Sequence, residues 1–180
     1  MSFNLRIITR VAVFASLVFI FSYFSAFLYN INLGFFVIFV SGFLWGLWPG
    51  VGVALVGYFL WSNFNPFGPV PLPLLLSQLI GVSIIALIGT IVSKIFIPEK
   101  WNRKGLVILM ISGFLSGLFY HIPVDIVDAF LYQPFWPRLI GGSIFSLITI
   151  VSCSIIFPLF YPALALMYKK ENNNRYENIK

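Results

Sequence analysis

Long apolar runs make up most of the chain, and short polar or Pro/Gly-rich stretches separate them. About 20 consecutive apolar residues cross the hydrocarbon core of a bilayer as a helix. The pattern therefore predicts an all-α membrane protein with six transmembrane helices, over residues 5–29, 33–47, 51–64, 74–96, 105–131 and 136–168. The second and third spans are short, with a turn at Trp48-Pro49-Gly50 between them. One longer stretch broken at Pro49 is the alternative.

Charged residues are nearly absent from the first half of the chain. No Asp, Glu, Lys or Arg occurs between Arg10 and Lys94, and only 9% of the 180 residues are charged. A soluble surface needs charged side chains, whereas a charge at the bilayer centre costs about 2.5–3.5 kcal/mol. This composition excludes a soluble domain. It predicts one membrane domain over residues 1–168 and a polar, disordered cytoplasmic tail over residues 169–180.

The basic residues predict the orientation, because cytoplasmic loops carry an excess of Lys and Arg. With six spans and a cytoplasmic N-terminus, Arg138 is the one residue among the 11 Lys and Arg that falls outside. With five spans, the cluster from Lys94 to Lys104 would also lie outside. We therefore expect a multi-pass protein of the cell membrane with both termini in the cytoplasm. The net charge of +6 is then a topology signal, and no nucleic-acid partner is expected.

Polar side chains gather in the predicted outer half of the spans. The sharpest group is His121, Asp125 and Asp128, whose spacings of four and three put them on one helix face. Ionisable residues within a membrane point to function by default, so we expect an outward-facing ligand site. Further candidate ligand-binding residues are Asn63, Asn65, Gln78, Tyr58, Trp61, Tyr120, Trp136 and Arg138.

Other roles for these residues stay open at this point. Asp125 and Asp128 would alternatively cap the helix end or pair with Arg138. His121 and Asp125 at a spacing of four would also suit zinc, but no further ligand set accompanies them, so neither a metal nor another cofactor is expected. The chain has no GxxxxGK[ST], GxSxG or HExxH motif, and we do not expect an enzyme.

Small residues predict close helix contacts, because packing replaces the hydrophobic effect between helices in a membrane. Gly113 and Gly117 form a GxxxG pattern on the fifth span. Ala12 and Ser16 form a small-xxx-small face on the cytoplasmic half of the first span. We expect this face to dock a partner helix, and packing within the chain is the alternative.

Together these features resemble the S component, the substrate-binding subunit, of energy-coupling factor (ECF) vitamin transporters. That family has six helices, about this length, cytoplasmic termini and a small-residue motif on the first helix, here Ala12 and Ser16. The start Met1-Ser2-Phe3 lacks the Met-x-His motif of the nickel and cobalt members. The resemblance implies a high-affinity binding subunit for a vitamin or related micronutrient. Its implied partners are a transmembrane coupling subunit and two ATPase subunits.

The residues of the expected site give a preference for the ligand. Two carboxylates among aromatic side chains favour a cationic or heteroaromatic molecule, such as thiamine or its precursor. Amide-bearing ligands would suit Asn63, Asn65 and Gln78 equally well. Two functions of other classes remain as alternatives. One is an intramembrane enzyme for a lipid or prenyl substrate, with Asp125 and Asp128 holding a Mg²⁺-diphosphate, and the other is a structural membrane scaffold.

Overall fold

The structure is a computed structural model that describes residues 5–28, 30–98 and 102–177, with side chains up to residue 173. Tyr29, Lys100 and residues 178–180, which the predictions also covered, lie outside the described residues. The described chain forms seven helices, which confirms the all-α class. They are α1 (Leu5–Ser25), α2 (Gly34–Trp45), α3 (Leu47–Phe64), α4 (Leu72–Ile95), α5 (Arg103–Leu131), α6 (Phe135–Leu159) and α7 (Tyr161–Glu177).

Four of these helices, α1, α4, α5 and α6, are long and apolar enough to cross a membrane. They give the chain the make-up of a multi-pass membrane protein. The number of crossings stays a prediction, because α2 has only 12 residues. At 1.5 Å per residue, a helix of that length covers roughly 18 Å, about two thirds of the hydrocarbon core.

Helix α2 lies at the centre of the molecule. Every residue from Gly34 to Leu44 is buried, as expected for a helix that is apolar on all sides. The helical structure is interrupted between α2 and α3 at Gly46, and not at Pro49 as the sequence predicted. Gly46 has a φ of +85°, which residues with a Cβ rarely adopt. Pro49 lies in the first turn of α3, where its missing N–H removes no helical hydrogen bond.

The predicted sixth span is two helices. Helix α6 ends at Leu159 and α7 begins at Tyr161, with Pro158 and Pro162 on either side of the break. Helix α7 continues through Glu177, so it includes residues 169–177 of the predicted tail. Its first part packs on the core, where Tyr161 and Leu164 are buried. This packing extends helical structure into residues whose composition alone favours disorder.

Helices α5 and α6 form the most extensive helix pair, and the predicted GxxxG motif lies in their contact. A Cβ at Gly113 would collide with the carbonyl group of Cys153, and one at Gly117 would lie 2.8 Å from Cα of Ile150. Helix α5 begins where the side chain of Asn102 accepts a hydrogen bond from the N–H of Gly105 at 2.6 Å. Helix α4 then packs against α2, α3 and α5.

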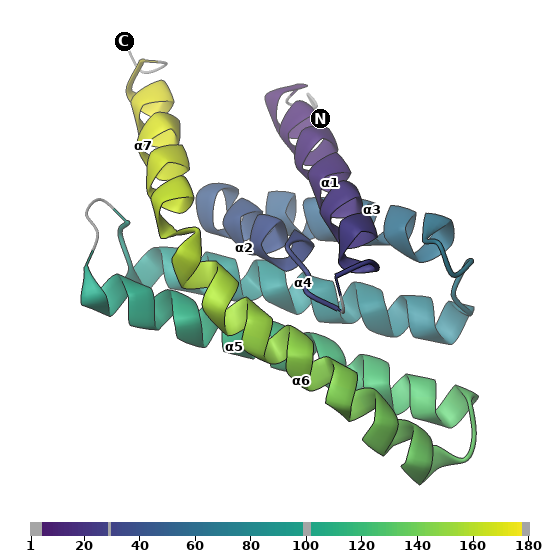
Figure 1. Cartoon of the computed structure of the whole chain (residues 1–180). Coiled ribbons are helices and arrows are strands. Elements are labelled where there is room, and N and C mark those ends of the chain that lie inside the picture. Colours follow the sequence, from purple (N-terminus) through teal and green to yellow (C-terminus); the bar gives the residue numbers. More distant parts are fainter. Residues whose placement is uncertain (1–4, 29, 99–101, 178–180) are drawn as a thin grey trace.

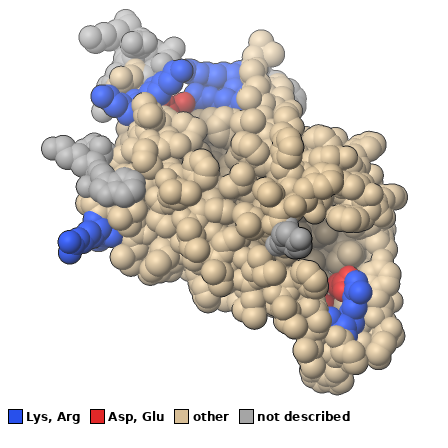
Figure 2. Space-filling model, viewed as in Figure 1, with Lys and Arg blue, Asp and Glu red and all other residues tan. Residues whose placement is uncertain are grey.

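The two ends of the bundle differ in charge. The first turns of α1 and the last turns of α7 point to the same side of the molecule (Figure 1). Most Lys and Arg atoms visible in Figure 2 lie along its upper and left edges, and one separate group with acidic atoms lies at the lower right. We call the end with the first turn of α1 and the last turns of α7 the terminal end. We call the end with Asp128 and Arg138 the cavity end. Their orientation relative to a membrane stays a prediction.

Candidate functional site

A cavity of about 530 Å³ opens at the cavity end. Its walls come from helices α1 to α6, from the α1–α2 turn and from the α3–α4 loop. The volume lies within the 300–1,000 Å³ that is typical of small-molecule sites. The cavity therefore brings together side chains from nearly the whole length of the chain.

Three aromatic rings form its buried wall. The ring centroid of Phe35 lies 5.9 Å from that of Tyr58 and 4.6 Å from that of Tyr120, and the last two are 5.5 Å apart. The amide of Asn32 donates a hydrogen bond of 2.8 Å to the hydroxyl of Tyr58. Tyr120 approaches α4 closely at Gly81, where a Cβ would lie 2.9 Å from Cδ2 of the ring. These contacts fix flat apolar surfaces beside the polar groups.

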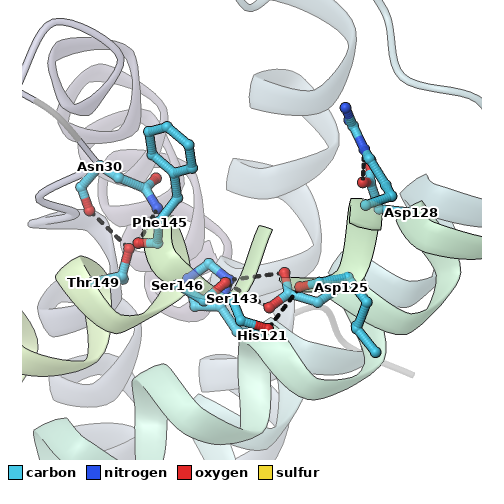
Figure 3. Close-up of polar contacts among 10 residues, drawn as sticks. Asn30, His121, Asp125, Asp128, Ser143, Phe145, Ser146 and Thr149 are labelled. Carbon is cyan, nitrogen blue, oxygen red and sulfur yellow. Dashed lines mark hydrogen bonds and ion pairs between the residues drawn. The ribbon is translucent and has the colours of Figure 1, made fainter. Parts of the chain in front are cut away.

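A hydrogen-bonded cluster of His121, Asp125 and Ser146 joins α5 to α6 (Figure 3). The hydroxyl of Ser146 donates to Oδ2 of Asp125 at 2.5 Å and lies 2.9 Å from Nδ1 of His121. The same ring nitrogen lies 3.5 Å from Oδ1 of Asp125. In a Ser-His-Asp catalytic triad, by contrast, Ser and Asp contact opposite nitrogens of the imidazole. This cluster therefore lacks the geometry that activates a serine.

Asp128 lies at the cavity but already has a cationic partner. Nε of Arg138 is 2.6 Å and Nη2 is 3.2 Å from its two carboxylate oxygens. The guanidinium also lies over the ring of Tyr132, 5.2 Å from its centroid. The structure thus contains the Asp128–Arg138 pair, which the sequence analysis gave as an alternative to ligand binding by Asp128. It leaves Asp125 as the cavity carboxylate without an Arg or Lys partner among the described side chains.

Gln78 adds hydrogen-bond donors to the wall. Its Oε1 accepts a hydrogen bond of 2.6 Å from the hydroxyl of Ser62, so its amide nitrogen is left to donate elsewhere. Across the cavity, the α1–α2 turn is fastened to α6. The amide of Asn30 donates to the carbonyl of Phe145 at 3.1 Å, and the hydroxyl of Thr149 donates to the carbonyl of Asn30 at 2.8 Å. Figure 3 shows both contacts.

Seven of the predicted ligand-binding residues line this one cavity: Tyr58, Trp61, Gln78, Tyr120, His121, Asp125 and Asp128. The other four do not line it. Asn63 bonds to the carbonyl of Phe59 in its own helix, and Asn65 holds the α3–α4 loop through Ser62, Phe67 and Gly68. Trp136 is 68% exposed, and Arg138 reaches the site only through Asp128.

Sequence reasoning missed several lining residues, chiefly Asn30, Asn32, Ser146 and Thr149. The two asparagines follow the first apolar run directly, so their position at a span end was a usable signal. Ser146 and Thr149 offered none, because isolated Ser and Thr in a membrane helix commonly bond to their own backbone. Only the contacts of α6 reveal their role, with α5 for Ser146 and with the α1–α2 turn for Thr149.

His121, Asp125 and Ser146 also line a second hollow, of about 340 Å³, between α5 and α6. Its other walls are mostly aliphatic, including Leu118 and Ile150.

Among the described residues, no three His, Cys, Asp or Glu side chains gather closely enough to hold a metal ion.

The predicted docking residues lie at the other end of the molecule. Ala12 and Ser16 are exposed on α1, and the hydroxyl of Ser16 bonds to the carbonyl of Ala12. A different face of α1, with Ala15 and Val18, packs against α3 at Gly57. The small-residue face therefore makes no internal helix contact in the described chain.

Comparison with known proteins adds no relative: no family model, no curated protein and no solved structure matches the chain.

Proposed function

We propose that the chain is a membrane-embedded binding subunit for the uptake of a vitamin or related micronutrient, of the ECF S-component kind. Release of the substrate on the other side would require a transmembrane coupling subunit and two ATPase subunits. The cavity carries the proposal. It is large enough for a vitamin-sized molecule, it opens at one end of an apolar bundle, and it combines aromatic walls with polar side chains that can form directional hydrogen bonds.

The charges around the cavity favour a cation. Arg138 neutralises Asp128, whereas the nearest ionisable neighbour of Asp125 is a histidine. With a neutral His121, the described cavity wall carries one uncompensated negative charge. The rings of Phe35, Tyr58 and Tyr120 offer faces that attract cations. A singly charged aromatic or heteroaromatic molecule suits this combination.

The test is to purify the protein from its membrane, extract it and identify retained small molecules by mass spectrometry. A blocking variant makes the result specific. Gly142 lines the cavity, and a side chain added there meets no atom within 4 Å. We expect Gly142→Trp to lose the retained molecule. Gly141→Trp is the matched control, since Gly141 is equally open but does not line the cavity. Loss in both variants, or in neither, contradicts the proposal.

The second hollow favours one other candidate, an intramembrane enzyme for a lipid or prenyl substrate, because it brings an aliphatic groove to the polar cluster. Two observations weigh against it. Asp128 is engaged by Arg138, and Ser146 donates to Asp125, which leaves no activated nucleophile. The same mass-spectrometry experiment separates the candidates, because a retained prenyl or phospholipid would support the enzyme. A structural scaffold would retain neither.

A further inference from the structure

The hydroxyl of Ser146 has one proton, and its geometry decides where that proton goes. The oxygen lies 2.5 Å from Oδ2 of Asp125 and 2.9 Å from Nδ1 of His121. An ionised carboxylate can only accept a hydrogen bond. The proton of Ser146 therefore points to Asp125, and its oxygen has only lone pairs to offer to the imidazole.

That choice fixes the tautomer of the histidine. Facing a lone pair, Nδ1 must carry a proton, which Oδ1 of Asp125 at 3.5 Å also attracts. In a neutral imidazole the other nitrogen, Nε2, is then a bare acceptor. The other carboxylate on this face of the helix, Asp128, is held by Arg138, and the ring of Tyr120 lies 5.0 Å from the imidazole.

Nε2 of His121 is buried and has no hydrogen-bond partner among the described residues. A buried polar atom without a partner destabilises the fold, and native structures contain few of them. A protonated Nε2 would add a charged donor with no acceptor, which is the more costly state. Nε2 is therefore an unpaired hydrogen-bond acceptor, and its ring lines the cavity.

We propose that Ser146 holds His121 as the neutral Nδ1–H tautomer, and that Nε2 is the subsite that accepts a hydrogen bond from an N–H group of the bound cation. Ser146 is a positioning residue in this scheme and Asp125 supplies the negative charge. Nε2 is buried in the structure, so this scheme requires a small movement of the cavity wall that lets the ligand reach it. The inference rests on the proposed function and names the ligand chemistry: an aromatic monocation with an N–H donor.

The chain has a single histidine, so ¹⁵N-histidine labelling of the whole protein, carrying a histidine-free tag, gives two side-chain signals. We expect Nδ1 to resonate as a protonated nitrogen and Nε2 as an unprotonated one. In Ser146→Ala this preference should be lost, and Ser146→Thr, which keeps the hydroxyl, should restore it. Ser143→Ala is the matched control, because the Ser143 hydroxyl bonds to the carbonyl of Leu139 one turn away.

Two probe cations test the subsite. Benzylammonium and benzyltrimethylammonium share a ring and a single charge, but only the first has N–H donors. We expect benzylammonium to bind and shift the Nε2 signal, and benzyltrimethylammonium to leave that signal in place. Ser146→Ala should weaken benzylammonium binding about tenfold, the worth of one hydrogen bond.

A protonated Nε2 in the wild-type protein overturns the inference, because the ring is then either the imidazolium or the Nε2–H tautomer and Nε2 cannot accept a hydrogen bond. Equal shifts with both cations, no shift with bound benzylammonium, or no benzylammonium binding also overturn it. The proposed function fails separately, by the absence of any retained micronutrient. A protein that retains such a molecule while Nε2 is protonated keeps the function and loses only this inference.

Discussion

Arg10 and Glu171 lie 161 positions apart in the chain, yet Nη2 of Arg10 is 2.8 Å and 2.6 Å from the two carboxylate oxygens of Glu171. The same guanidinium lies over the ring of Trp45, 5.2 Å from its centroid. This contact ties α1, α2 and α7 together at the terminal end. Glu171 lies in the part of α7 that extends into the predicted tail.

Removing the charge of Glu171 should loosen that end. We expect Glu171→Gln to lower the free energy of unfolding by about 1–3 kcal/mol, because the pair is largely buried and its partner is left uncompensated. Thermal unfolding in detergent would measure the change. The exchange Arg10→Glu with Glu171→Arg should recover part of the loss, and a double variant no better than the single one would contradict the prediction.

Asp125 should dominate ligand binding. We expect Asp125→Asn to weaken binding of the retained molecule by about 1.5–3 kcal/mol, roughly 10- to 150-fold in Kd, the range for hydrogen bonds to charged groups. Calorimetry with the identified molecule would measure it. Asn63→Ala is the control and should bind normally, because Asn63 bonds within α3 outside the cavity. Unchanged affinity in both Asp125→Asn and His121→Ala would assign these residues to helix packing.

The exposed face of α1 should dock the coupling subunit. Ala12→Trp has room on the surface, so we expect the variant to fold and to keep its ligand but to lose co-purification with that subunit and transport. Ala15→Trp is the matched contrast. Ala15 is 1% exposed, so a bulky side chain there should destabilise the fold itself. Normal transport by Ala12→Trp would place docking elsewhere on the molecule.

The α5–α6 contact should tolerate no added methyl group at Gly113. Because the new Cβ would meet the backbone of Cys153, we expect Gly113→Ala to cost about 1–3 kcal/mol of stability through overpacking. Gly141→Ala, where no atom lies within 4 Å, should be neutral or stabilise the helix by up to about 1 kcal/mol. Comparable thermal stabilities for the two variants would contradict the assigned contact.

The two ends of the bundle should lie on opposite sides of the membrane. Cysteines introduced at Phe67 and Arg103 are good probes, because both residues are exposed and the native Cys153 is buried. In intact cells we expect an impermeant maleimide to label Phe67→Cys only, and Arg103→Cys to react after permeabilisation. Labelling of Arg103→Cys alone in intact cells would reverse the predicted orientation.

Hydrophobic pattern predicted most of the helices, since long apolar runs leave few alternatives to membrane helices. The pattern did not predict correctly where one helix ends and the next begins. Gly46 ends α2 through its backbone conformation, and Phe160 separates two helices within one apolar run. Neither position changes the hydropathy of the sequence. Local structure at these points depends on which conformation the surrounding packing selects.

The sequence predicted the candidate site best where its side chains carry charge or stand out from an apolar background. His121 and Asp125 met that condition, and both line the cavity. Ser146 did not, because a serine hydroxyl in a helix is chemically ordinary until a neighbouring helix supplies its partners. Asn63 and Asn65 also stand out from the apolar background, but they do not line the cavity. Asn63 bonds to a carbonyl group within α3, and Asn65 bonds within the α3–α4 loop.

The burial of α2 has a consequence for biogenesis. A helix that other helices surround on every side has no permanent lipid neighbours, and its length falls short of the bilayer core. During synthesis it precedes α4, one of the helices that enclose it in the folded protein. The nascent chain must therefore hold α2 in the membrane, or at its surface, until α4 emerges from the ribosome. Folding of the cavity end can be completed only after α5 and α6 have followed, which makes the last part of translation the step at which the cavity forms.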